Sequence, residues 1–206
     1  AGEAGDGPLH AALRKAHPIG GLRSEAIGPS RQVGDLPPAA VATVPGVADA
    51  VSLHFVIAKV DDEAAGNGVA FSGPIDPVLV VTMVDGSADL GDDGMLVSAT
   101  ESREKGWTMG TTVQLTSNDG DLVPVTVSGI YEDSQVLGNW VVSEDAYQRL
   151  TPQPPLPDFM VLVKAAPGTD LATLRTDLEK AVDPAKIVDV MDRDEFKGQQ
   201  AQQIDT

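Results

Sequence analysis

Cysteine is absent from this chain of 206 residues. The absence excludes both a disulfide framework and a thiolate metal site. Histidine is nearly as scarce, with three residues and no H-E-x-x-H pattern of the kind that binds zinc. His54 falls in a strand-like stretch of alternating residues and is interpreted as a sheet residue rather than a metal ligand.

Basic residues and long apolar runs are also few. The 14 Lys and Arg residues face 31 Asp and Glu residues, so the formal net charge is -17. Such a charge repels a phosphate backbone, and nucleic acid is therefore not an expected partner. Apolar runs such as Pro77–Val84 are far shorter than the roughly 20 residues of a membrane helix, so no membrane span is predicted. The start at Ala1, without a signal-peptide pattern, indicates an excised piece or a processed chain.

Aromatic residues make up only 4% of the chain, whereas apolar residues make up 42%. That apolar share can fill the core of a folded domain of this length. The core must consist mainly of Val, Leu, Ile and Ala. Trp107 and Trp140 are predicted to be core residues.

Patterns for catalysis are weak. The stretch "GNGVAFSG" lacks the spacing of a phosphate-binding loop. Ser102 and Lys105 fit S-x-x-K, but neither S-D-N nor K-T-G accompanies them. The neighbouring Glu101, Arg103 and Glu104 are typical of a solvated helix face. We therefore expect no catalytic residue, no cofactor and no enzymatic activity.

The acidic stretch Asp85–Gly94, "DGSADLGDDG", is the best metal candidate. If its last glycine is the sharp-turn residue of an EF-hand loop, Asp89 and Asp93 fall at ligand positions. Gly91 then replaces a ligand, and Glu101 lies one residue beyond the bidentate acid. A solvated loop is favoured over a calcium site. The weak metal candidates are Asp85, Asp89, Asp92 and Asp93.

The two ends of the chain share one pattern. Near the N-terminus, residues 9–16 have apolar positions on one helical face and are interpreted as a helix or a mobile leader. A helix from Asp35 to Pro45 then precedes a strand over residues 47–60. The tail repeats this order, with a strand at 159–164, a helix from about 169 and a strand at 187–190. Two such units, the first preceded by a candidate strand near Leu22–Ile27, predict a split β-α-β frame of ferredoxin-like type.

The middle of the chain has short strands and many turns. Gly106–Asp133 predicts a hairpin that turns at "SNDG", and a later strand enters a helix capped near Ser143. The proline-rich run Thr151–Asp158 is interpreted as a linker, with an SH3 ligand as the alternative. The predicted class is therefore α+β. Residues 1–60 and 158–206 form one discontinuous subdomain, and residues 61–157 form a β-rich insertion.

The order of these segments resembles the extracytoplasmic domain of MacB/FtsX-like ABC transporter permeases, over about residues 35 to 200. In that family a P-G-V and a strand follow the first helix, a G-x-D-P-like turn precedes an apolar stretch, and G-x-x-x-G-D-x-V opens a hairpin that closes on V-x-G-I. Thr111 replaces the usual Asp of the third pattern. The residues that carry the resemblance are Pro45, Gly46, Val47, Pro74, Asp76, Pro77, Gly106, Gly110, Val113, Gly129 and Ile130.

The resemblance implies a Porter-type frame with a Sabre-type insertion, placed outside the bacterial cell membrane between two membrane helices of a permease. The implied partners are the membrane helices of the same full-length chain, a cytoplasmic ABC ATPase, a second permease copy and an extracytoplasmic substrate or protein. Asp192 and Glu195 form a capping-box pattern that would begin a membrane-proximal stalk. The stalk residues would be Asp192, Glu195, Phe196 and Ile204. The competing hypothesis is a free-standing secreted or lipid-anchored module that binds calcium through the acidic loop.

Overall fold

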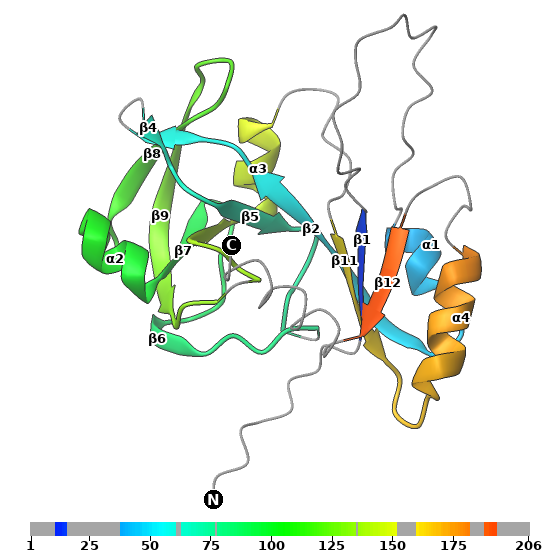
Figure 1. Ribbon diagram of the computed structural model, residues 1–206. Helices are drawn as coiled ribbons and strands as arrows, with labels where there is room; N and C mark the ends of the chain where they lie inside the picture. Colours follow the sequence, from blue (N-terminus) through cyan, green and yellow to red (C-terminus); the bar gives the residue numbers. More distant parts are fainter. Residues whose placement is uncertain are drawn as a thin grey trace, which may run out of the picture.

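The computed structural model describes residues 11–15, 38–60, 63–76, 78–134, 136–151, 160–181 and 188–192. Over these ranges the protein is a mixed α+β structure with a long, branched sheet. Figure 1 shows helices α1 and α4 at one end of the molecule and the β-rich part, with α2 and α3, at the other. The strands are β1 Ala11–Lys15, β2 Val47–Val56, β3 Lys59–Val60, β4 Glu63–Ala64, β5 Gly68–Phe71, β6 Met83–Gly86, β7 Gly94–Ser98, β8 Thr112–Thr116, β9 Leu122–Tyr131, β10 Trp140–Val142, β11 Met160–Ala165 and β12 Val188–Asp192. The helices are α1 Pro38–Ala42, α2 Ala99–Lys105, α3 Glu144–Leu150 and α4 Leu171–Ala181.

At one end the strand order is β12-β1-β11-β2, and each neighbour in this order is antiparallel. Strands β1 and β2 are therefore parallel to each other and separated by β11. Helices α1 and α4 contact each other and cover one face of these strands. Their buried side chains share a cluster with residues of β11 and β12: Val41, Val44, Val161, Val163, Ala165, Leu174, Leu178 and Val190.

The helix interpretation of residues 9–16 is wrong for Ala11–Lys15, which form β1. Ala, Leu, Arg and Lys all favour helices in isolation. Here both edges of the segment are paired, Leu13 with Val161 of β11 and with Val190 of β12. These long-range backbone hydrogen bonds override the local preference. The candidate strand Leu22–Ile27 lies outside the described residues.

The rest of the sheet curves so that β3, near its far end, directly follows β2 in the chain. From β2 the order runs β5-β10-β7-β9-β8-β3, and β3 follows β2 in the chain after only Ile57 and Ala58. Inside this curved sheet lies the largest cluster of buried residues, which includes both tryptophans. Trp140 is fully buried and Trp107 is 8% exposed, so the prediction that both are core residues is confirmed.

A second cluster lies on the opposite face and joins the two ends of the molecule. Strand side chains alternate between faces, so Trp140 and Val142 of β10 enter the first cluster while Val141 enters this one. Residues of β2 and β11, including Leu53 and Leu162, pack in the same cluster. Strands β2 and β11 of the α1/α4 end and the strands of the β-rich part therefore share one apolar cluster, while the residues under α1 and α4 form a separate one on the other face of β11.

The predicted local elements of the middle region are confirmed. Strands β8 and β9 pair antiparallel with Thr116 opposite Leu122, as the hairpin pattern predicted. The Ser117 hydroxyl accepts hydrogen bonds from the backbone N–H groups of Asp119 and Asp121 across the turn, at 3.2 and 3.1 Å. Ser143 caps α3, its hydroxyl accepting from the Ala146 N–H at 3.2 Å.

Candidate functional site

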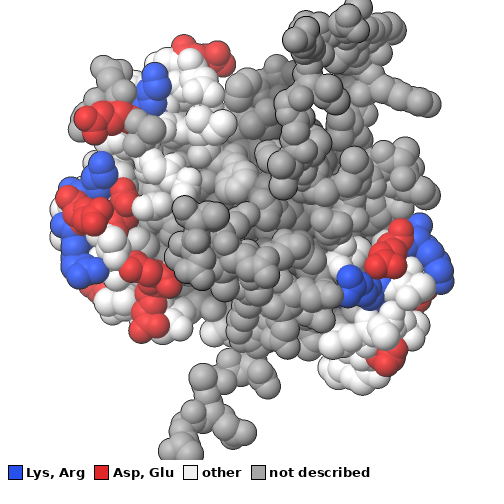
Figure 2. All heavy atoms as spheres, viewed as in Figure 1, with Lys and Arg blue, Asp and Glu red and all other residues white. Residues whose placement is uncertain are grey.

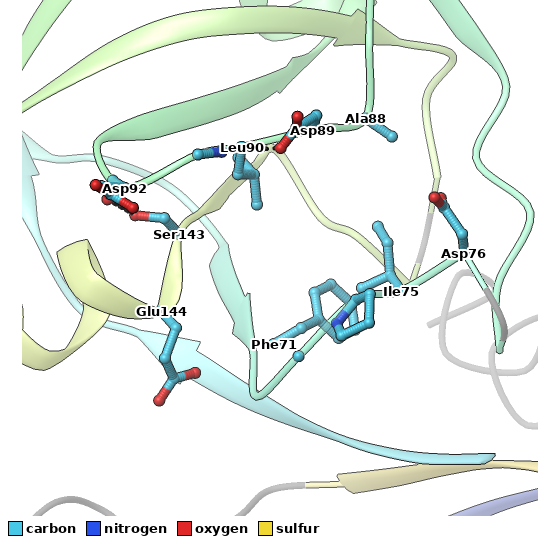
Figure 3. Close-up of a pocket in the computed structure, with 12 residues that line it drawn as sticks. Phe71, Ile75, Asp76, Ala88, Asp89, Leu90, Asp92, Ser143 and Glu144 are labelled. Atoms are coloured by element: carbon cyan, nitrogen blue, oxygen red, sulfur yellow. Dashed lines mark hydrogen bonds between the residues drawn. The ribbon is translucent and has the colours of Figure 1, made fainter.

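A cleft of about 530 Å³ lies between three loops of the β-rich part. It is bounded by the turn after β5, by the acidic loop between β6 and β7, and by the start of α3. Figure 3 shows Leu90 from the acidic loop and Ile75 from the turn pointing toward each other across the space, with Phe71 at its base. The lining residues are Phe71, Gly73, Pro74, Ile75, Asp76, Ala88, Asp89, Leu90, Gly91, Asp92, Ser143 and Glu144.

The turn after β5 carries the G-P-I-D-P motif. The Ile75 carbonyl accepts hydrogen bonds from the N–H groups of Val78 and Leu79, at 2.9 and 2.8 Å. Ile75 is buried in the cluster that joins the two ends, whereas Pro74 and Asp76 are exposed. The motif therefore anchors one wall of the cleft and places a carboxylate at its edge. Pro77 lies outside the described residues.

The acidic loop is a solvated turn in which three of the four carboxylates make separate contacts. Asp85 accepts from the Gly86 N–H at 2.8 Å, and Asp89 accepts from the Gly91 N–H at 3.1 Å. Asp93 forms an ion pair with Arg149 of α3. Among the described residues, no three acidic or histidine side chains converge in a way that could hold a metal ion. The calcium candidates Asp85, Asp89, Asp92 and Asp93 are thus not brought together as ligands.

The backbone of this loop is tied to α3. The Ser143 hydroxyl donates to the Asp92 carbonyl, while the same oxygen caps the helix. The Ser143 N–H donates to the Gly94 carbonyl at 3.1 Å. One residue therefore sets both the start of α3 and the position of the loop that forms the opposite wall of the cleft.

The interpretation of Glu101 as part of a solvated face is wrong, because Glu101 is only 4% exposed. Its carboxylate accepts a hydrogen bond from the Asn139 side-chain N–H at 2.7 Å. Arg103 and Glu104 are exposed as predicted, Lys105 is exposed as well, and Ser102 is half-buried. The S-x-x-K pattern thus lies on a short surface helix.

The sequence contains a capping-box pattern that was not predicted and that explains the position of Glu101. Ser98 and Glu101 have the S-x-x-E spacing of a capping box. The Ser98 hydroxyl accepts from the Glu101 N–H at 3.1 Å, as in that motif. The Ser98 N–H, however, donates to the Asn139 carbonyl at 2.8 Å, and the Glu101 carboxylate binds the Asn139 amide. Asn139 thus completes the cap from a distant loop.

Two further titratable groups surround this cap. Burial raises the pKa of Tyr131, and the negative charges of Asp133 and Glu101 act in the same direction. The Tyr131 hydroxyl donates to the Gly138 carbonyl at 2.9 Å. Asp133 accepts from the Thr100 hydroxyl and from the Thr100 N–H at 2.5 and 3.0 Å, and these bonds lower the pKa of Asp133. The cluster holds α2 to β9 and to the loop before β10.

The remaining motif residues of the hairpin have structural roles. Gly106 ends α2 in the left-handed conformation, with φ of 69°, which a glycine adopts without steric cost. The Gly110 N–H donates to the Val127 carbonyl at 2.8 Å, and Val113 is buried. A Cβ on Gly129 would lie 2.5 Å from the backbone carbonyl oxygen of Ser87, so the absence of a side chain lets the chain after β6 approach β9 closely. Ile130 is half-buried against the larger core cluster.

Thr111, where the family pattern has Asp, forms the turn before β8. Its hydroxyl accepts from the Thr108 N–H at 3.1 Å, and its own N–H donates to the Thr108 carbonyl at 3.0 Å. An Asp carboxylate can accept the same bond. The exchange therefore keeps the local hydrogen bond.

The P-G-V motif joins the two helical units. Pro45 and Gly46 lie in the turn between α1 and β2, and Val47 begins β2. The Gly46 carbonyl accepts from the Ala166 N–H at 2.8 Å, which ties this turn to the one after β11. Of the stalk residues, Asp192 is the last residue of β12, and Glu195, Phe196 and Ile204 lie outside the described residues. No described helix is long and apolar enough to cross a membrane.

No family model and no curated protein match this sequence. Solved structures do match. The periplasmic region of MacB from Actinobacillus actinomycetemcomitans is 14% identical with a TM-score of 0.61, covering 95% of this chain and 94% of that one. A domain assigned to a permease of Porphyromonas gingivalis is 13% identical with a TM-score of 0.54, covering 88% of this chain and 87% of that one.

The extracellular domain of the ABC-type transporter YknZ from Gram-positive bacteria is 17% identical with a TM-score of 0.52. That match covers 74% of this chain and 86% of the YknZ domain. At such identities the likeness concerns the fold, and it extends over nearly the whole length of the MacB region. The resemblance indicated by the order of the sequence motifs is confirmed at this level: the chain has the fold of a MacB-like periplasmic domain.

Proposed function

We propose that this protein is a non-catalytic extracytoplasmic domain of an ABC transporter permease, which couples movements of membrane helices to a substrate or partner outside the membrane. The proposed frame is ferredoxin-like and consists of residues 1–60 and 158–206, with residues 61–157 as a Sabre-type insertion. The strand order β12-β1-β11-β2, with both helices on one face, supports this division.

One observation carries the proposal. The first and last described strands are direct neighbours, with Ala11 of β1 opposite Asp192 of β12. The chain therefore arrives at and leaves the domain at one place on the frame. A domain inserted between two consecutive membrane helices needs this arrangement, because both connections must reach the same patch of membrane. The similarity to the MacB and YknZ domains supports the same placement.

The core offers a route for mechanical coupling. The cluster that joins the two ends contains Leu162 of β11 and also Leu96 and Val141 of the β-rich part, all fully buried. Close-packed interiors move as rigid units rather than deforming continuously. A displacement of β1 and β12 by membrane helices would thus move the β-rich part as a body.

The proposed partners follow from this role. They are the membrane helices of the full-length chain, reached through a stalk that starts near Asp192, and a cytoplasmic ABC ATPase. A second permease copy and an extracytoplasmic substrate or protein complete the assembly. The proposed location is the outer side of a bacterial cell membrane.

Membrane fractionation of the full-length gene product tests the proposal. We expect the protein to stay in the membrane pellet after alkaline carbonate washing, and external protease to cleave this domain in intact spheroplasts. The encoded chain should have apolar spans on both sides of the 206 residues. Release by carbonate, or a reading frame without such spans, would favour the secreted module and refute the permease assignment.

A further inference from the structure

The cleft between the turn after β5, the acidic loop and α3 has walls of two kinds. Its apolar surface comes from Phe71, Ile75 and Leu90, of which Phe71 and Ile75 are 3% and 5% exposed. These side chains belong to, or pack against, the core cluster that joins the two ends of the molecule. The apolar floor is therefore rigid, and the volume of about 530 Å³ falls in the range of ligand pockets.

Among the described residues that line the cleft, all the charged ones are acidic. Four of the lining residues are carboxylates, namely Asp76, Asp89, Asp92 and Glu144, and none of the lining residues is Lys, Arg or His. Within the described part of the chain, no ion pair involves any of these four. Figure 3 shows their carboxyl groups around the edge of the space rather than at its centre.

Basic side chains of the domain gather elsewhere. Figure 2 shows Lys and Arg beside Asp and Glu over α2 and α4. On α4, Arg175 pairs with Glu179 at 3.3 Å and Lys180 with Asp177 at 3.1 Å. Arg149 pairs with Asp93, just outside the cleft lining. No described basic residue lines the cleft, so nothing in its lining neutralises the negative charge of the four carboxylates.

Glu144 adds an unsatisfied acceptor. Its Oε1 accepts from the Gln148 side-chain N–H at 3.2 Å. Its Oε2 is buried and has no hydrogen-bond partner among the described residues. A buried carboxylate oxygen without a donor carries a desolvation cost.

From these observations we propose that the cleft binds a cationic, aliphatic polypeptide segment of a partner protein. The aliphatic side chains would fill the space between Ile75 and Leu90. Lysine side chains suit the rim because their methylene stems cover apolar surface while the ammonium group reaches a carboxylate. Complementary charge of this kind accelerates association and selects partners. The proposal applies to a permease domain and to a free-standing module alike. Its failure would therefore not refute the proposed function, nor would failure of the proposed function refute it.

The test uses the 206-residue chain and short capped probe peptides. A peptide of alternating Lys and Leu is titrated while backbone amide shifts are followed by NMR, and a Lys/Ser peptide of equal charge serves as the matched probe. We expect the Lys/Leu peptide to shift the amides of Ala88, Leu90 and Glu144. The Lys/Ser peptide should bind at least about tenfold more weakly, because it cannot use the apolar wall.

A pair of variants with equal charge change locates the site. Asp89→Asn with Asp92→Asn removes two rim charges but keeps the oxygen that accepts from Gly91. Asp119→Asn with Asp121→Asn makes the same change in the exposed β8–β9 turn. Each exposed ion pair changes an affinity by about fivefold at most, so the rim variant, which loses two, should bind the Lys/Leu peptide about tenfold more weakly. The turn variant should bind like the wild type.

Three results would overturn the proposal. Equal weakening in both variants would mean that only net charge matters, and equal binding of the two peptides would mean that the apolar wall is not used. Displacement of the Lys/Leu peptide by millimolar calcium, with calcium shifting the same amides, would show a cation site in place of a peptide site.

Discussion

Gly68 and Trp140 offer a direct test of how the β-rich part is packed. They lie opposite each other in the parallel pair β5 and β10. A Cβ added to Gly68 would lie 2.1 Å from Trp140 Cη2, 2.2 Å from Cζ2 and 2.4 Å from Cζ3. The indole therefore occupies the place where any other residue at position 68 would have its side chain. Gly68→Ala is the perturbation.

The magnitude follows from how little the indole can move. Trp140 is 0% exposed, and its Nε1–H donates to the Ala65 carbonyl at 2.6 Å. Overpacking in a well-filled core typically costs about 1 to 3 kcal/mol. Because three ring atoms clash and the ring is anchored, we expect Gly68→Ala to cost about 3 kcal/mol. For a chain of this size that lowers the Tm by about 6 to 12 °C.

A double-mutant cycle isolates the clash. Trp140→Phe removes the outer atoms of the indole ring and the hydrogen bond to Ala65, at a cost of about 3 kcal/mol. In that background the methyl group introduced by Gly68→Ala gains room, so the double variant should be more stable than the sum of the two losses by at least about 1.5 kcal/mol. Urea unfolding, followed by circular dichroism and by tryptophan fluorescence, measures all four proteins.

Gly120→Ala is the matched control. It adds the same methyl group where nothing lies within 4 Å, at a φ of 90°. Its cost of about 1 to 2 kcal/mol comes from the backbone alone. That cost should add to the cost of Trp140→Phe without coupling. If Gly68→Ala and Trp140→Phe were also additive to within about 0.5 kcal/mol, the steric explanation would be refuted.

Two further predictions concern the cap of α2. Glu101→Ala leaves the Asn139 amide without its acceptor and should cost about 2 to 3 kcal/mol in urea unfolding, whereas Glu101→Gln keeps an acceptor and should cost less than about 1 kcal/mol; similar losses would contradict the role of this bond. Hydrogen bonds from Thr100 hold the Asp133 pKa below the ordinary value of about 3.9. The stabilisation is therefore present above that value and lost as the pH falls through the folded-state pKa. Thr100→Val should raise the Asp133 pKa in a carbon-13 NMR titration, and an unchanged pKa would show that another group sets it.

The cleft shows why sites of this kind escape sequence reading. Its carboxylates come from three separate segments, and the sequence reading grouped only Asp89 and Asp92, as calcium candidates. Asp76 and Glu144 join them because Ser143 ties the acidic loop to α3 and Ile75 anchors the facing turn in the core. The acidic composition can be read from the sequence, whereas the apolar floor between the carboxylates depends on which distant segments pack together.

Local features follow from the sequence alone because their causes lie within a few residues. Alternation of apolar and polar residues in β8 and β9, the turn at Ser117, and the helix cap at Ser143 are of this kind. The order of the motifs was also sufficient to indicate the fold that the comparisons support. These features need no information about which distant segments meet.

Tertiary structure alone decided the identity of β1 and the burial of Glu101. Residues 11–15 favour a helix by propensity, and they form a strand because β11 and β12, from the other end of the chain, pair with both edges. Glu101 has the pattern of a surface helix, and it is buried because Asn139 arrives from another loop to bind its carboxylate. In both cases the deciding hydrogen bonds come from distant residues, and short-range periodicity contains no information about such partners.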